Sequence, residues 1–179
     1  MLTEIVISGF GGQGILFAGK CLAYAGMLAG MEVSWLPSYG PEMRGGTANC
    51  SICLSDSPIG SPLINEPDIL IAMNTPSFDR FADSVKSDGR IFVDCSITNR
   101  ISDRDDVLCQ CIPTSQIAQE NELAGMANIV LLGNVLKNCA DRLGGVNFET
   151  LKEAFRHIIP QSKSGLADNN IKALMLGMA

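Results

Sequence analysis

The chain has 179 residues, of which 46% are hydrophobic and 18% are charged, and its net charge is −6. This length suits one domain with a sizeable core, and an acidic chain without a basic tract is not expected to bind nucleic acid. The charged fraction is below the roughly 25% of an average soluble domain, so we expect partner subunits to cover part of the surface.

Export and membrane insertion are both disfavoured by the sequence. The start MLTEIVIS has the pattern of a strand and lacks the basic and apolar regions of a secretory signal. The low-charge stretch 15–31 includes Lys20 and is shorter than the roughly 20 residues of a membrane span, so a buried helix is expected there. With seven cysteines, an odd number, we expect reduced thiols and a cytoplasmic protein that does not contact a membrane.

Apolar periodicity predicts alternating strands and helices over the first two thirds of the chain, followed by helices. The expected strands are 5–8, 32–36, 48–54, 69–73, 91–93 and 107–112. The expected helices are 13–29, 77–85, 115–122, 128–143, 148–159 and 166–178. This order predicts an α/β fold in a single domain, 1–179, with a mostly parallel sheet, helices on both faces and a helical C-terminal part.

The glycines after the first expected strand form a recognisable pattern. Gly9, Gly11 and Gly14 have the spacing G-x-G-x-x-G, and the residues that follow favour a helix. This order resembles the Rossmann-like strand–glycine turn–helix of dinucleotide sites, where backbone N–H groups at the helix N-terminus bind an anion. The acid that holds the ribose is absent from the end of the second strand, since Glu32 lies at its start. Dinucleotide binding is therefore the weaker interpretation, and a purely structural tight turn remains an alternative.

The same segment nearly matches a P-loop from Gly14 to Lys20. A P-loop requires a glycine-rich segment before its lysine and a Ser or Thr after it to hold magnesium. Here the apolar residues 15–18 precede Lys20, and Cys21 follows it. We interpret this match as chance.

A second unusual loop follows the second expected strand and reads PSYGPEMRGGT. Loops after successive parallel strands share one edge of the sheet, so this loop is expected to lie close to Gly11, Gly12 and Gln13. Arg44 has the planar donor group that binds a phosphate or carboxylate. The alternative is that Arg44 pairs with Glu42 or with a backbone carbonyl.

The two loops together carry a family resemblance. GFGGQGILFAGKCLAYAG and PSYGPEMRGGTANCSICLSDSPIGSPLINEPDILIAMN resemble the gamma subunit, or gamma domain, of the 2-oxoacid:ferredoxin oxidoreductases. The resemblance is close over 5–74 and continues more loosely to near Phe155. The sister family of indolepyruvate oxidoreductases tends to have Gln before Arg-Gly-Gly, so Glu42-Met43-Arg44 favours the pyruvate, 2-oxoglutarate and 2-oxoisovalerate branch.

The resemblance implies a role inside an enzyme complex. Such complexes decarboxylate a 2-oxoacid on thiamine diphosphate, pass electrons through iron–sulfur clusters to ferredoxin and transfer the acyl group to coenzyme A. It implies partner alpha and beta subunits, and a ferredoxin-like delta subunit where the complex has one, that hold the thiamine diphosphate, magnesium and clusters. This chain alone would bind no cofactor and would be inactive.

The same resemblance implies which residues of this chain matter. Contacts to the phosphates of coenzyme A are expected from Gly11, Gly12, Gln13, Gly14 and Arg44. A surface facing the partner subunits is expected at Tyr39, Gly40, Pro41, Glu42, Met43, Arg44, Gly45 and Gly46. No residue is expected to be catalytic or to bind a metal. The alternatives are an indolepyruvate-type subunit, an independent nucleotide-binding oxidoreductase and an assembly protein with no part in the chemistry.

The cysteines and the single histidine are interpreted as structural. Cys50 and Cys53 have the spacing C-x-x-C, but a cluster or structural zinc normally needs four ligands and no second such pair exists. On a strand these two side chains point to opposite faces, so we expect small buried apolar residues. His157 lies in an expected helix near the C-terminus and is interpreted as a surface residue.

Overall fold

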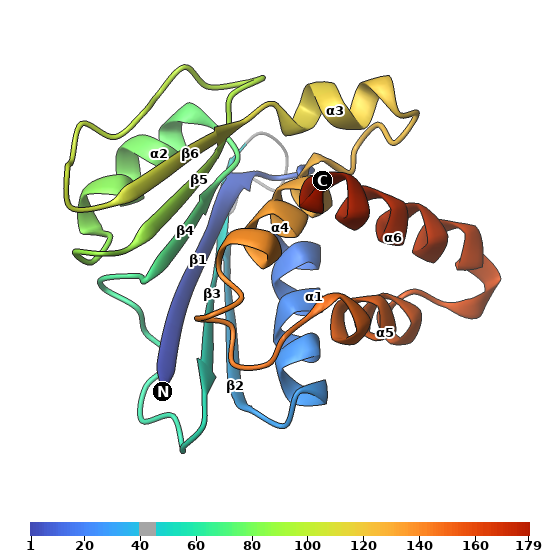
Figure 1. The fold of residues 1–179 in the computed structure, drawn as a ribbon, viewed down its shortest axis with the longest axis horizontal. Helices are drawn as coiled ribbons and strands as arrows, with labels where there is room; N and C mark the ends of the chain where they lie inside the picture. Colours follow the sequence, from blue (N-terminus) through green and yellow to red (C-terminus); the bar gives the residue numbers. More distant parts are fainter. Residues whose placement is uncertain (40–45) are drawn as a thin grey trace.

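Six strands form one mixed sheet in the order β2-β3-β1-β4-β5-β6 (Figure 1). The computed structural model describes residues 1–39 and 46–179. The strands are β1 (Leu2–Phe10), β2 (Glu32–Tyr39), β3 (Thr47–Ser55), β4 (Ile69–Ala72), β5 (Arg90–Asp94) and β6 (Leu108–Ile112). All the expected strands are therefore present, several of them longer than expected.

β3 is the strand that runs against the others. It pairs antiparallel with both β1 and β2, whereas β1, β4, β5 and β6 are parallel to one another. A parallel connection needs a crossover of about a dozen residues or more, and the chain between Tyr39 and Thr47 is too short for one. The sheet is mostly parallel as expected, but β3 lies between β1 and β2, a position that the sequence analysis did not predict.

The helices are also found where they were expected. They are α1 (Ile15–Leu28), α2 (Thr75–Phe81), α3 (Thr114–Glu120), α4 (Ala127–Asn138), α5 (Phe148–Ile158) and α6 (Ser164–Met178). Short 3-10 turns span Ala82–Ser84 and Gln161–Lys163. α4 ends at Asn138 and not at residue 143, because hydrogen-bonded turns follow it, such as the one from Arg142 N to Cys139 O (2.8 Å).

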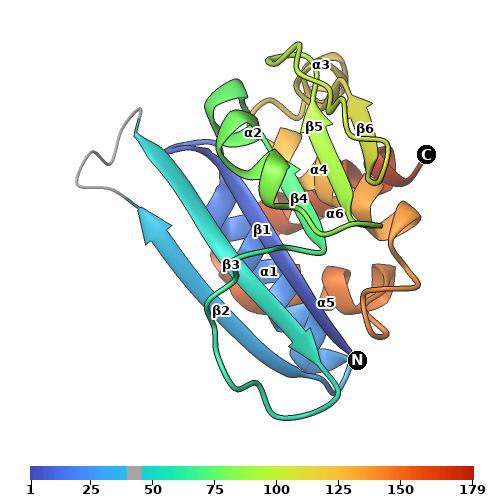
Figure 2. The ribbon, with the colours of Figure 1, turned by 90° about the vertical axis from the view of Figure 1, so that its left-hand side faces the viewer.

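The two faces of the sheet are covered unequally. Figure 1 shows α1, α4, α5 and α6 together on one side, and α2 on the other. In Figure 2, α2 lies over the β4 end of the sheet, and no helix of the described residues covers the outer face of β2 and β3. Helices lie on both faces, as expected, but most of the core is on one side.

The core follows from the alternation of side chains along the strands. Ile5, Ile7 and Ile52 face the side of α1 and belong to the larger buried cluster. Val6 and Leu70 face α2 and belong to the smaller one. β4 is buried along its whole length, which explains its uninterrupted apolar sequence.

Candidate functional site

The glycine turn joins β1 to α1 at the carboxyl edge of the sheet. Gly12 and Gly14 have φ angles of 99° and 72°, in the left-handed region that favours glycine. The turn is closed by a hydrogen bond from Gln13 N to Phe10 O (3.1 Å). Gly14 precedes the first residue of α1, and none of the described side chains caps that helix. The first N–H groups of α1 are therefore backbone donors without an intrahelical partner.

The second loop meets this turn through a backbone hydrogen bond. Gly11 N donates to Gly46 O at 2.9 Å, so the last residue of the loop lies beside the glycines, as expected. The reason is that β2 ends and β3 begins at the edge of the sheet where β1 ends. This bond occupies the Gly11 N–H, which was one of the expected phosphate donors. Tyr39 and Gly46 are described, whereas the predictions for Gly40, Pro41, Glu42, Met43, Arg44 and Gly45 lie outside the described residues.

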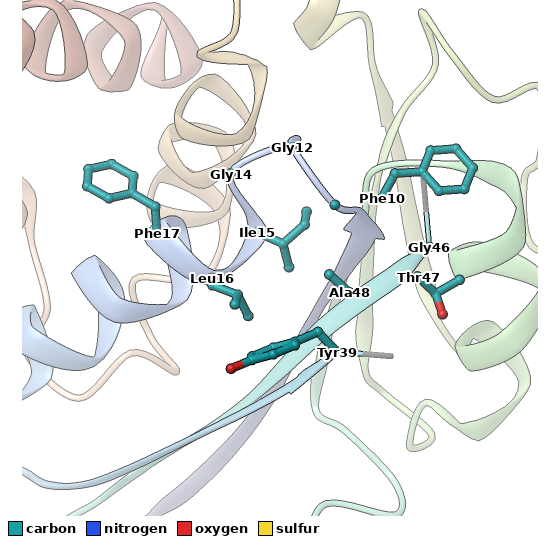
Figure 3. A pocket seen from close by; sticks show the side chains of 11 residues that line it. Phe10, Gly12, Gly14, Ile15, Leu16, Phe17, Tyr39, Gly46, Thr47 and Ala48 are labelled. Atoms are coloured by element: carbon teal, nitrogen blue, oxygen red, sulfur yellow. The ribbon is translucent and has the colours of Figure 1, made fainter. Parts of the chain in front are cut away.

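A pocket of about 430 Å³ lies between the glycine turn, the start of α1 and the ends of β2 and β3 (Figure 3). Its walls are mainly apolar, and Tyr39 is the only titratable side chain among the described residues that line it. Figure 3 shows the Tyr39 ring beneath Leu16, with Phe10 and Phe17 on opposite sides of the turn. The lining residues are Phe10, Gly11, Gly12, Gly14, Ile15, Leu16, Phe17, Tyr39, Gly46, Thr47 and Ala48. This arrangement suits a group with an apolar body whose polar end meets backbone N–H groups.

Gln13 has a role that the sequence analysis did not predict. Its Oε1 accepts hydrogen bonds from Phe10 N (2.6 Å) and Asn74 Nδ2 (3.3 Å), and its Nε2 donates to Met73 O (3.0 Å). The side chain thus bridges the ends of β1 and β4. The helix that follows β1, α1, lies on one face of the sheet, and the helix that follows β4, α2, lies on the other. Open α/β sheets bind their ligands in the crevice between two such strands, at the carboxyl ends of the strands. Gln13 also lines a second cleft of about 390 Å³, which extends toward α3.

We expect Gln13→Leu to lower the free energy of unfolding by about 1–3 kcal/mol, because the part-buried Phe10 N–H and Met73 carbonyl lose their hydrogen bonds to the Gln13 side chain. Urea denaturation measures the loss. Gln116→Leu is the matched control, since the Gln116 side chain donates to Glu120 on the exposed surface of α3 (2.8 Å), and the loss of this exposed bond should cost no more than about 0.5 kcal/mol. Equal effects of the two substitutions would contradict the bridging role.

Asn128 is a second residue of the site that sequence reasoning missed. It lies in the first turn of α4, is 5% exposed, and donates from Nδ2 to Gly14 O at 2.9 Å. Its Oδ1 has no hydrogen-bond partner among the described residues, which is uncommon for a buried polar atom. The available signal was a polar residue directly before the apolar run 129–132.

The dinucleotide interpretation finds little support in this geometry. Because β3 separates β1 from β2, the end of β2 lies two strand spacings from β1, or roughly 10 Å. Glu32 begins β2, at the opposite edge of the sheet from the glycine turn. It therefore does not occupy the position of a ribose-binding acid.

The cysteines of the C-x-x-C pair face opposite sides of β3, as expected. Cys50 pairs in register with Ile7, which belongs to the larger cluster, whereas Cys53 pairs with Glu4. Burial raises the pKa of Cys50 to about 12. Among the described residues there is no group of three or more His, Cys, Asp or Glu side chains that could hold a metal ion. His157 lies on α5, where its ring contacts Tyr24 and its Nε2 is 3.5 Å from Glu153 Oε1.

In the described part of the chain, no helix combines the length and apolar character that a membrane crossing requires.

The family is decided by a comparison of the whole chain. The family model described as "Pyruvate ferredoxin/flavodoxin oxidoreductase" matches residues 4–179. The chain belongs to this family. This match includes α5 and α6 and extends beyond Phe155, the point near which the looser sequence resemblance ended.

Relatives within the pyruvate ferredoxin/flavodoxin oxidoreductase family occur as long and short chains. Ketoisovalerate oxidoreductase subunit VorA of Methanothermobacter thermautotrophicus is 39% identical over 175 residues, which cover 98% of this chain and 35% of VorA. 2-oxoglutarate synthase subunit KorC of Methanocaldococcus jannaschii is 35% identical over 181 residues, covering 99% of this chain and 92% of KorC. Both names belong to the branch that the second loop favoured. The chain spans about a third of VorA and most of KorC.

A solved structure has the same fold. The keto/oxoacid ferredoxin oxidoreductase gamma subunit from Geobacter sulfurreducens is similar with a TM-score of 0.83 and 26% sequence identity, over 99% of this chain and 95% of that one. The expected α/β fold and the resemblance to gamma subunits are thereby confirmed.

Proposed function

We propose that residues 1–179 form one gamma-type domain that acts as a subunit of a 2-oxoacid:ferredoxin oxidoreductase. The complex would decarboxylate a 2-oxoacid with thiamine diphosphate, form an acyl-CoA and pass electrons to ferredoxin. One observation carries the proposal. The two loops that bear the family resemblance meet through the bond from Gly11 N to Gly46 O (2.9 Å) and line one pocket.

Within this complex the pocket would form part of the wall on the coenzyme A side. The backbone donors at Gly12, Gly14 and the start of α1 suit a phosphate, and the apolar walls suit an uncharged part of the same ligand. None of the described lining residues is cationic. Arg44 would therefore supply the positive charge that pairs with the phosphate. The exposed Tyr39, together with 40–46, would face the partner subunits.

The cofactors are proposed to belong to the partners. Alpha and beta subunits, and a delta subunit where present, would hold the thiamine diphosphate, magnesium and iron–sulfur clusters, and ferredoxin would bind to the complex. The cytoplasm is the proposed location, in agreement with seven cysteines that form no disulfide.

The first test compares the isolated chain with the co-expressed complex. We expect the isolated chain to lack cluster absorbance and to have no 2-oxoacid-dependent reduction of ferredoxin, because it would contain neither the thiamine diphosphate site nor the clusters. The complex should show both. Turnover by the chain alone would overturn the proposal, as would micromolar binding of NAD(P) or FAD in calorimetry.

A second test addresses coenzyme A. In the complex, Arg44→Ala should weaken the apparent affinity for coenzyme A by about 1.5–3 kcal/mol, the contribution of a charged hydrogen bond, or about 10- to 150-fold. Steady-state kinetics at varied coenzyme A measures this change. Lys20→Ala is the control, since it removes a positive charge from an exposed position on α1. If both variants retain the kinetics of the wild type, only a scaffold role remains for this loop.

A further inference from the structure

The two edges of the sheet differ in how well they are protected against pairing with another strand. Natural sheets discourage such pairing with prolines and charged residues on their edge strands. β2, at one edge, contains Glu32 and Pro37. β6, at the other edge (Figure 2), reads LCQCI and contains neither a charged residue nor a proline. β6 is therefore the edge that can accept a further strand, and neither the family match nor the proposed function assigns a role to it.

The backbone of β6 presents hydrogen-bonding groups on its outer side. Leu108 N donates to Gly89 O at 3.0 Å, on the side of β5. Successive residues of a strand direct their N–H and C=O groups alternately to its two sides, so those of Cys109 and Cys111 point away from β5. No turn or loop in the described part of the chain bonds to the backbone of these two residues. Their donors and acceptors are available to another chain.

The side chains of β6 complement those of a second β6. An antiparallel pair with a two-fold axis at Gln110 sets Leu108 opposite Ile112 of the second copy. Cys109 then lies opposite Cys111, and Gln110 lies opposite Gln110. Leu108, which is 52% exposed in the single chain, gains an apolar neighbour.

The residue at the two-fold axis also suits this pairing in its charge. A residue at the axis meets its own copy, so a charged side chain there would be repelled. Gln110 is neutral, and its amide can both donate and accept a hydrogen bond. The other four residues of β6 are also uncharged, so the pairing brings no like charges together within the strands.

We propose that β6 pairs antiparallel with β6 of a second copy of this chain, which joins the two sheets into one. In this register Cys109 N donates to Cys111 O of the second copy, and Cys111 N donates to Cys109 O. The two-fold axis repeats both bonds, so every outward backbone group of the two residues is paired. Pro113, which directly follows β6, has no N–H and ends the pairing.

The first test measures the mass of the full chain in solution by sedimentation equilibrium at increasing concentration. We expect a monomer that converts to a dimer. Amide hydrogen exchange followed by NMR then locates the interface. Exchange at Cys109 and Cys111 should slow as the dimer forms, because their N–H groups become hydrogen-bonded. Exchange at Gln110, whose N–H already bonds to β5, should change less.

Two substitutions test the register. Cys111→Pro removes the N–H that is donated to the second copy, and proline is tolerated where the N–H of an edge strand faces outward. Because two of the four bonds between the copies are lost, the dissociation constant of the dimer should rise by about 5- to 150-fold. Gln110→Lys should also weaken the dimer, since it places like charges opposite each other. Gln161→Lys is the matched control, because it adds the same charge at an exposed position between α5 and α6.

Circular dichroism verifies that the variants are folded. The proposal is overturned if the chain remains a monomer at all concentrations, or if Cys109 and Cys111 exchange equally fast in monomer and dimer. It is also overturned if Gln110→Lys and Gln161→Lys have the same effect on the dimer. Protection of Cys109 and Cys111 only in the co-expressed complex would show that a strand of a partner subunit occupies this edge. The proposed function does not depend on any of these outcomes.

Discussion

Gly14→Val is expected to lower the free energy of unfolding by about 2–5 kcal/mol. Gly14 has a φ of 72°, where a side chain costs about 1–2 kcal/mol. A Cβ at this position would collide with Asn128 Nδ2 and lie 3.1 Å from Asn128 Cγ, and overpacking of this kind costs about 1–3 kcal/mol. Urea denaturation of the purified chain measures the sum.

A double-mutant cycle separates the two contributions. In an Asn128→Ala background the collision is removed while the strain at φ remains, so Gly14→Val should cost about 1–3 kcal/mol less than in the wild type. Gly14 O keeps the hydrogen bond from Ala18 N (3.0 Å) in this background. An identical cost in both backgrounds would show that Asn128 does not limit the space at Gly14.

Gly133→Val is expected to destabilise the chain by about 1–3 kcal/mol through overpacking between α4 and α6. A Cβ at Gly133 would collide with the Leu174 carbonyl and lie 3.0 Å from Gly177 Cα. These are backbone atoms, which cannot rotate away, so the two helices must separate. Hydrogen exchange should show faster opening of α4 and α6 than of β1. Since α4 also positions Asn128 against Gly14 (2.9 Å), the same change should loosen the glycine turn.

Gly165→Ala is the matched control on α6. A Cβ there would have no neighbour within 4 Å. Gly165 lies in the first turn of α6, and replacing such a glycine by alanine stabilises a protein by about 0.4–1 kcal/mol, chiefly by reducing the entropy of the unfolded chain. The two glycine substitutions should therefore change stability in opposite directions. A loss of stability for Gly165→Ala, or no loss for Gly133→Val, would contradict the close approach of the helices as the cause.

The elements of this fold could be predicted because each depends on neighbours in the sequence. β4 is an uninterrupted apolar run and is buried along its length, as expected of a strand covered on both faces. α5 has its apolar residues at helical spacing, and Asn147 caps it. The family could also be predicted, because the two loops that carry its motifs are contiguous stretches of the chain.

Pairings between distant residues were beyond this reasoning. The periodicity of 47–55 indicates a strand but not that it lies between β1 and β2. Gln13 was expected to face a ligand, yet it bonds to Asn74, which is 61 residues away. Asn128 contacts Gly14 from 114 residues away. No local pattern in the sequence reports such contacts.

The sequence by itself therefore determined the α/β class, the boundaries of most elements and the family, since these follow from periodicity and from motifs within contiguous stretches. Only the tertiary structure decided the place of β3, the bridge made by Gln13 and the buried Asn128. The physical reason is that these features depend on which strands and helices pack together, and that choice minimises the free energy of the whole chain and not of any single segment.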